Sequence, residues 1–225
     1  MELVVYDNAE AVAVGAARRI TELANTSADR FSLGLAGGST PVATYEQLRT
    51  HEIDWGKLVV WLSDERWVPH DDERSNGRMA IETLIDHVGV RYETPRWSEM
   101  MEAGDSAAYY EATLRSLHED GHPDLVLLGM GSDGHTASLF PGSAALDEHS
   151  RWYVGNVIPE TGEARLTATY PLLWSARRLI VITAGESKAE ALRDSFAGKT
   201  PAGRIGEGDA EVEWHVDTAA ASLLS

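Results

Sequence analysis

Residues 124–142 read D-L-V-L-L-G-M-G-S-D-G-H-T-A-S-L-F-P-G, an apolar run followed by a glycine-rich segment. Its apolar run, residues 125–128, has the length and branching of a strand that is buried on both faces of a sheet. Three glycines follow within six residues, and around the last of them stand a carboxylate, Asp133, and an imidazole, His135. Glycine lets the backbone turn sharply and approach a ligand closely. The stretch therefore predicts a carboxylate and a histidine at the carboxyl end of a buried strand, where open α/β sheets bind ligands.

Other motifs compete for the same glycine-rich turn. Residues 129–134 formally match the dinucleotide fingerprint G-x-G-x-x-G, but no acidic residue closes a second strand about 20 residues later. A serine nucleophile elbow requires G-x-S-x-G, and Met130 replaces the first glycine before Ser132. A structural turn with a hydrogen-bonded histidine stays open as the alternative to a catalytic His135.

Composition limits both the fold and the partners. The chain has 225 residues, 43% of them hydrophobic, which suits one α/β domain over residues 1–225 with room for a small lobe within residues 140–175. The net charge of −17 opposes binding to nucleic acid and to anionic membranes. The chain has no cysteine, no apolar stretch of about 18 residues and an acidic N-terminal segment. We therefore expect a cytoplasmic protein without a secretory signal.

Strand-like and helix-like segments alternate along the chain. Short apolar runs predict strands, and most are followed by segments in which apolar residues have helical spacing. This order predicts an α/β fold of three layers, in which a mainly parallel, Rossmann-like sheet has helices on both faces. Residues 91–104 read as irregular, and residues 106–118 read as a helix. The predicted strands are residues 2–6, 31–36, 58–62, 125–128, 151–154, 178–183 and 212–216, and residues 165–170 read as a strand or an extended segment.

Two segments have the features of a phosphate site. Gly37 and Gly38 precede a helix for which Thr40 is a good N-cap and Pro41 a good first residue, so free N–H groups meet the positive end of the helix dipole. Lys188 falls in the first turn of a later predicted helix, where the dipole disfavours a cation, and a bound anion explains it better than helix stability does. A tight turn with an ordinary cap and a solvated lysine are the alternatives.

Charged residues are crowded after the predicted strand 58–62. Asp64 and Arg66 follow it directly, and charges at the end of a buried strand need a partner or a ligand. An ion pair of Arg66 with Asp64 or its neighbour is one explanation, and a ligand site is the other. Arg74 and Asn76 lie in the polar loop beyond, which forms either a surface loop or a lid. Since the carboxyl ends of parallel strands share one edge, we expect one pocket with a phosphate side and a histidine side.

A metal site is not expected. Residues 118–122 read H-E-D-G-H and so mimic the zinc motif H-E-x-x-H, which needs both histidines on one continuous helix. Gly121 and Pro123 end the predicted helix there, and the chain has no cysteine to serve as a ligand.

Six segments together carry a resemblance to a known family. They read G-G-S-T-P at 37–41, S-D-E-R-W-V-P at 63–69, S-N at 75–76, G-M-G-S-D-G-H-T-A-S-L-F-P-G at 129–142, R-L-T at 165–167 and G-E-S-K-A at 185–189. In this order they resemble the 6-phosphogluconolactonases of the glucosamine-6-phosphate isomerase/6-phosphogluconolactonase family. The resemblance spans nearly the whole chain, and the longest segment is the most specific.

The resemblance implies the sugar-phosphate isomerase/deaminase type of fold. It also implies hydrolysis of 6-phospho-D-glucono-1,5-lactone to 6-phospho-D-gluconate, the second step of the oxidative pentose phosphate pathway, with no metal and no organic cofactor. His135 is then the general base with Asp133 as its orienter, and Arg66 and Arg165 stabilise the phosphate or the developing oxyanion. The predicted binding residues are Gly37, Gly38, Ser39, Thr40, Asp64, Asn76, Gly131 and Lys188.

Two other functions fit the same resemblance. The related glucosamine-6-phosphate deaminases carry an acid where this chain has Phe140 and an aromatic residue where it has Arg66, and both departures favour the lactonase. A sugar-phosphate sensor without activity would be tethered to a DNA-binding helix-turn-helix, which neither the N-terminal strand nor the net charge of −17 supports. We expect a small phosphorylated lactone as the partner of a monomer or weak homodimer.

Overall fold

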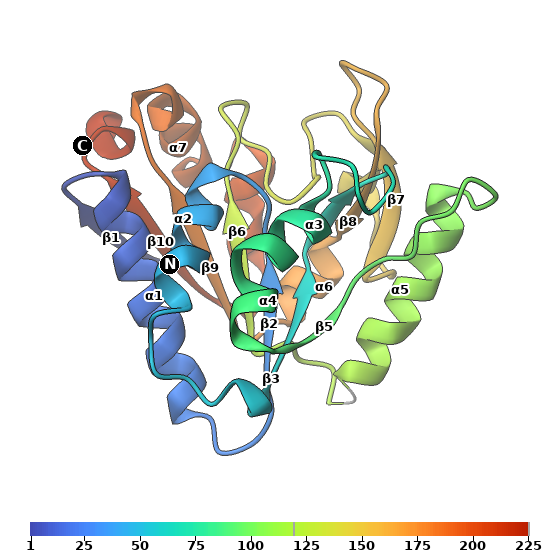
Figure 1. The fold of residues 1–225 in the computed structure, drawn as a ribbon. Helices are drawn as coiled ribbons and strands as arrows, with labels where there is room; N and C mark the ends of the chain where they lie inside the picture. The colour runs from blue at the N-terminus through green and yellow to red at the C-terminus, as the bar shows by residue number, and fades with distance from the viewer. Residues whose placement is uncertain (119, 225) are drawn as a thin grey trace.

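The computed structural model describes residues 1–118 and 120–224. Within these residues the strands are β1 (Glu2–Tyr6), β2 (Phe31–Leu35), β3 (Leu58–Leu62), β4 (Asp64–Arg66), β5 (Arg91–Glu93), β6 (Leu125–Gly129), β7 (Tyr153–Val157), β8 (Ala164–Ala168), β9 (Arg178–Thr183) and β10 (Glu211–Asp217). The described strands form a seven-stranded parallel sheet, in the order β1-β10-β9-β6-β2-β3-β5, and a three-stranded antiparallel sheet, β4-β8-β7. The smaller sheet stands to one side of the larger one, at the upper right of Figure 1.

Helices cover both faces of the main sheet (Figure 1). No described helix is both long enough and apolar enough to cross a membrane. The helices are α1 (Ala9–Thr26), α2 (Ser39–Leu48), α3 (Asn76–Ala80), a π-helical segment (Ile81–Ile85), α4 (Asp86–Val88), α5 (Ala103–Leu117), α6 (Tyr170–Ser175) and α7 (Ala189–Phe196), with 3-10 turns at Trp55–Lys57, Ala144–Asp147, Glu186–Lys188, Pro201–Glu207 and Ala220–Leu223.

The central strand β6 shows why the sheet is covered twice. Successive side chains of a strand point to opposite faces. Leu125 and Leu127 belong to a buried cluster with residues of α1 and α2, whereas Val126 and Leu128 belong to a second cluster with residues of α5, α6 and α7. All four side chains are fully buried. The three-layer α/β fold with a mainly parallel sheet is therefore confirmed.

The structure differs from the sequence prediction at short and exposed elements. β5 lies inside residues 91–104, which read as irregular, because Arg91 and Tyr92 are exposed at the sheet edge and leave no buried pattern. The three charged or polar residues of β4 also read as a loop. Helix α5 begins at Ala103 rather than at residue 106, and β7 begins at Tyr153 and runs on into residues that read as a loop.

The smaller sheet takes two of its strands from the stretch predicted to form a small lobe. β7 and β8 both fall within residues 140–175, and β8 pairs with β4, which directly follows the main-sheet strand β3. The small sheet is thus tied to the edge of the main sheet where the strands end. The division of the chain into one domain with a lobe stays a prediction.

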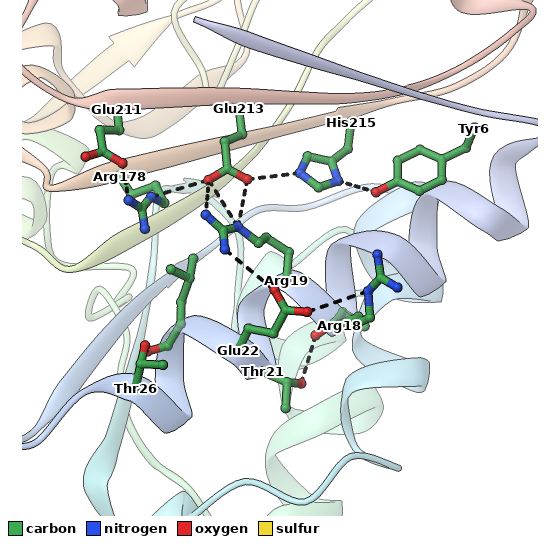
Figure 2. Close-up of polar contacts among 12 residues, drawn as sticks. Tyr6, Arg18, Arg19, Thr21, Glu22, Thr26, Arg178, Glu211, Glu213 and His215 are labelled. Carbon is green, nitrogen blue, oxygen red and sulfur yellow. Dashed lines mark hydrogen bonds and ion pairs between the residues drawn. The ribbon is translucent and has the colours of Figure 1, made fainter.

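A buried polar network joins α1 to the strands β1, β9 and β10 (Figure 2). Glu213 is only 6% exposed, and its carboxylate accepts hydrogen bonds from Arg19 Nε at 2.9 Å and Arg19 Nη2 at 2.7 Å. Arg178 adds an ion pair at 3.4 Å. His215 lies between Glu213, 3.4 Å from its Nε2, and the Tyr6 hydroxyl, 2.9 Å from its Nδ1. Every charge that the fold buries here has a partner, as buried ions require.

We expect the stability of the protein to fall on mild acidification. Burial lowers the pKa of His215, against the opposing effect of Glu213, and burial likewise lowers the pKa of His118. The folded chain therefore binds fewer protons than the unfolded chain, whose histidines titrate near pH ~6.5. The stability is complete above that pH and declines as the pH falls toward the lower folded-state values.

Urea unfolding between mildly alkaline and mildly acidic pH measures this effect. The free energy of unfolding should decrease as the pH falls, and His215→Gln should flatten the decrease because a neutral amide can accept from Tyr6 and donate to Glu213. A free energy that is constant or rises on acidification contradicts the burial argument.

Candidate active site

The carboxyl ends of the main-sheet strands surround a cavity at a topological switch point. β2 and β6 are neighbours, but the sheet continues from β2 to β3 on one side and from β6 to β9 on the other. Ligands bind open α/β sheets at such points. A cavity of about 240 Å³ opens there. Its lining residues are Ala36, Gly37, Gly38, Ser39, Thr40, Pro41, Asp64, Arg66, Asn76, Gly129, Met130, Gly131, His135, Ala137, Ile182, Thr183 and Lys188.

The start of α2 forms one wall of the cavity. Gly38, and not Thr40 as predicted, occupies the N-cap position, with φ at 112°. Only glycine adopts this backbone angle readily, so the helix begins at Ser39, two residues before Pro41. No side chain caps this helix, and the first N–H groups of a helix have no partner within it. Ser39 and Thr40 therefore bring free N–H groups and the positive end of the helix dipole to the cavity.

His135 and Asp133 form a close pair on the turn after β6. His135 Nδ1 lies 2.5 Å from Asp133 Oδ1, and the His135 backbone N–H donates to the same oxygen at 3.1 Å. Partial burial raises the pKa of Asp133, but the hydrogen bonds and charge of His135 outweigh it and lower that pKa overall. Asp133 is therefore an ionised acceptor in contact with the ring. His135 lines the cavity, whereas Asp133 lies outside its lining.

Gly131 makes room for this pair. A Cβ atom at position 131 would lie 2.2 Å from His135 Nδ1 and 2.4 Å from Asp133 Oδ1, closer than non-bonded atoms approach. The absence of a side chain there is thus a requirement of the pair. The sequence predicted Gly131 as a binding residue and as part of a flexible turn, but it gave no sign of this steric requirement.

Two residues that follow the pair shape its surroundings. The ring of Phe140 lies against His135, with centroids 4.3 Å apart. Ala137 has φ at 47°, a left-handed angle that alanine rarely adopts, and it lines the cavity. Strain of this kind persists where the surrounding structure imposes it, and it is concentrated at functional sites. The sequence gives no signal for the strained angle because alanine is ordinary in any element.

Asp64 is held at the cavity wall by two donors. It is 8% exposed, and its carboxylate accepts from Ser138 Oγ at 2.8 Å and from Asn76 Nδ2 at 3.2 Å. Asn76 is the first residue of α3 and only 2% exposed, so it forms part of the wall rather than a lid. Its amide packs on Gly37, where an added Cβ would lie 2.1 Å from Asn76 Oδ1.

The two predicted arginines stand side by side on the small sheet. Arg66 of β4 and Arg165 of β8 are directly opposite each other, and such cross-strand pairs share a face of the sheet. Arg66 lines the cavity, and its guanidinium donates to the Arg74 carbonyl oxygen. The alternative of an ion pair of Arg66 with Asp64 or Glu65 is not found among the described residues. Arg165 pairs with Glu163 at 2.7 Å and does not line the cavity.

β9 and the start of α7 form the wall opposite Arg66. Lys188 closes a 3-10 turn and occupies the N-cap position of α7, so the predicted cation lies one step before the helix and lines the cavity. Thr183, the last residue of β9, also lines it and is 2% exposed. Its hydroxyl has no hydrogen-bond partner in the described part of the chain. The sequence missed Thr183 because a threonine at the end of an apolar run reads only as a strand former.

The zinc-like motif at 118–122 does not form a helical pair of histidines. Helix α5 ends at Leu117, before His118, and His122 lies in the turn beyond. Glu119 lies outside the described residues. Among residues 1–118 and 120–224, no group of three or more histidine, aspartate or glutamate side chains is arranged to hold a metal ion.

Comparison with known proteins identifies the family. The sequence profile of the glucosamine-6-phosphate isomerases/6-phosphogluconolactonase family matches residues 7–214. The chain belongs to this family. It is 36% identical to a 6-phosphogluconolactonase of Nostoc sp. over 208 residues, which cover 87% of this chain and 85% of the relative.

Solved structures of the family have the same fold over the full chain. The 6-phosphogluconolactonase of Trypanosoma brucei superposes with a TM-score of 0.86 at 28% identity, covering 100% of this chain and 98% of the other. A monomeric glucosamine-6-phosphate deaminase superposes with a TM-score of 0.84 at 25% identity, covering 99% and 100%. Family membership and fold are therefore compatible with either of the two reactions for which these relatives are named. The residues that line the cavity have to distinguish them.

The cavity gathers most of the residues that the family resemblance predicts. Every predicted site residue lines it except Asp133, which lies behind His135, and Arg165, which stands beside Arg66. The roles of these residues stay predictions. The residues that the sequence did not predict, among them Met130, Ala137 and Thr183, come from neighbouring strand ends and turns.

Proposed function

We propose that this protein hydrolyses 6-phospho-D-glucono-1,5-lactone to 6-phospho-D-gluconate, the second step of the oxidative pentose phosphate pathway. The observation that carries the proposal is the contact of Phe140 with His135, whose ring centroids are 4.3 Å apart. The family resemblance puts an acid at this position in the deaminases, where it serves acid–base chemistry on the open-chain sugar. An apolar ring cannot exchange a proton, and the names of the relatives favour the same conclusion.

His135 is the proposed general base. The ionised Asp133 holds a proton on His135 Nδ1, which leaves the lone pair of Nε2 free to accept a proton from water. The water oxygen then attacks the lactone carbonyl carbon and forms a tetrahedral oxyanion. As this intermediate collapses, the ring C–O bond breaks and the leaving oxygen takes the proton back from Nε2. The products are a carboxylic acid, which ionises, and a free hydroxyl group.

The transition state carries negative charge at two places, the substrate phosphate and the oxyanion. Different residues of the cavity are suited to each. The N–H groups at the start of α2 and the Lys188 ammonium are suited to the substrate phosphate. We assign the oxyanion to Arg66, and to Arg165 as well once Glu163 releases its guanidinium, because the two arginines are directly opposite each other on β4 and β8. These groups supply local positive charge within a chain of net charge −17.

Glucosamine-6-phosphate deamination is the alternative, because a deaminase has the same fold. We expect the purified chain to accelerate lactone loss and to release no ammonia from glucosamine 6-phosphate beyond a blank without protein. Both substrates should be assayed side by side with the same preparation. Ammonia release without lactone hydrolysis contradicts the proposal and assigns the deaminase reaction instead.

The remaining expectations about the working protein stay part of this proposal. We propose that it acts on a phosphorylated sugar lactone without a metal or an organic cofactor, as a monomer or weak homodimer, in the cytoplasm. The family resemblance supports the substrate class and the reaction without a metal or an organic cofactor. Composition supports the compartment.

A further inference from the structure

Glu65 is a buried carboxylate next to the cavity that the proposed mechanism does not use. It stands in β4 between Asp64 and Arg66 and is only 5% exposed. Its Oε1 accepts from the backbone N–H groups of Arg66 and Asn76, both at 2.7 Å. Its Oε2 accepts from the Gly77 N–H at 2.7 Å and from the Ser75 hydroxyl at 3.0 Å. The two oxygens thus use four donors, and burial nevertheless raises the pKa of Glu65 against the lowering effect of these hydrogen bonds.

These donors lie at the two ends of one loop, which leaves β4 and returns to the start of α3. Arg66 is the last residue of β4, where residues 67–75 leave the sheet, and Asn76 and Gly77 begin α3, where the chain returns. A second bond ties the same ends, because the Arg66 guanidinium donates to the Arg74 carbonyl oxygen. A carboxylate at the start of a helix also meets the positive end of its dipole. Through these hydrogen bonds the buried Glu65 carboxylate connects the start of α3 to β4.

Two of the residues that Glu65 binds, Arg66 and Asn76, are part of the cavity wall. Asn76 donates from Nδ2 to the backbone oxygen of Asp64 at 2.9 Å and to its carboxylate at 3.2 Å. On its other side Asn76 rests against Gly37, which begins the turn into α2. The position of Asn76 thus sets the spacing between the Asp64–Arg66 wall and the phosphate side of the cavity.

We propose that Glu65 is a positioning residue whose carboxylate holds Asn76 and Arg66 in place on the cavity wall before substrate binds. The inference rests on the proposed function, since it assigns Glu65 a part in lactone hydrolysis. The role requires a carboxylate, because all four partners are donors and a glutamine would turn an amide N–H₂ group toward two of them. Glu65 acts through Asn76 and Arg66 and does not itself line the cavity.

The test compares Glu65→Gln with Glu82→Gln, an exposed glutamate in the helical segment that continues α3 and pairs with Arg78. Displacing cavity groups by about 1 Å costs on the order of 10²-fold in rate. We expect kcat/KM for the lactone to fall about that much in Glu65→Gln, measured on folded protein well below its Tm, and to stay at the wild-type value in Glu82→Gln.

A double-mutant cycle with Asn76→Ala separates positioning from general destabilisation. If Glu65 acts through Asn76, the double variant loses little more activity than the worse single variant, whereas independent losses overturn the inference. If Glu65→Gln does not fold, Ser75→Ala removes one of the four donors and should give a smaller loss that also fails to add to Asn76→Ala. Wild-type activity in Glu65→Gln overturns the inference alone. A wild type no faster than the blank overturns the proposed function and this inference with it.

Discussion

Replacing His135 by alanine is expected to lower kcat/KM for the lactone by about 10²–10⁴-fold, the usual contribution of one positioned base. The expectation follows from the pair with Asp133, because their 2.5 Å contact leaves Nε2 as the basic atom at the cavity. Asp133→Asn should cost less, since the base remains and only its tautomer and orientation are released. Initial rates of lactone loss, corrected for the uncatalysed reaction, measure both effects.

The matched control is His149→Ala. His149 is exposed and does not line the cavity, so this variant should retain the wild-type rate. Equal activity of wild type and His135→Ala contradicts the assignment of His135 as the base. The base is then a carboxylate of the site. Asp64 is then the first candidate because it lines the cavity wall.

Adding one methyl group at Gly131 is expected to disable the enzyme almost as strongly. The Cβ of Gly131→Ala would lie 2.2 Å from His135 Nδ1 and 2.4 Å from Asp133 Oδ1, so the pair has to move apart. A displacement of about 1 Å at a reacting group costs on the order of 10²-fold in rate. The loss should appear in kcat/KM for the lactone while the circular dichroism spectrum stays that of the wild type.

Gly129→Ala is the control for this substitution. The nearest atom to a Cβ at position 129 is the Gly37 carbonyl oxygen at 3.9 Å, an ordinary contact. This variant should retain most of the activity although it alters the same glycine-rich turn. Equal losses in Gly129→Ala and Gly131→Ala contradict the steric argument and indicate instead that any alanine stiffens the turn.

The sequence predicts the sheet and the edge where the cavity opens because both depend on periodic burial. The run 125–128 is buried on both faces, and such runs are typical of strands inside covered parallel sheets. Since parallel strands end at one edge, the glycines after β2 and the His135 turn after β6 had to lie near each other. Elements without buried periodicity were missed, such as β5 at the sheet edge and the polar β4.

The finer arrangement of the site is set by tertiary contacts that leave no local pattern. Thr40 has the right chemistry for an N-cap, but the φ of 112° at Gly38 starts α2 earlier. Arg66 has acidic neighbours in sequence, yet its guanidinium donates to a loop carbonyl while Glu65 accepts from backbone N–H groups. The left-handed angle of Ala137, with φ at 47°, likewise has no signature in its own residue type.

The decisive experiment for the proposed activity measures the rate of 6-phosphogluconolactone loss with and without the purified protein. The lactone is generated in situ, a metal chelator is present throughout, and a blank without protein records the spontaneous reaction. We expect the wild type to consume the lactone far faster than the blank and to yield 6-phosphogluconate. A wild-type rate equal to that of the blank would contradict the proposed lactonase activity.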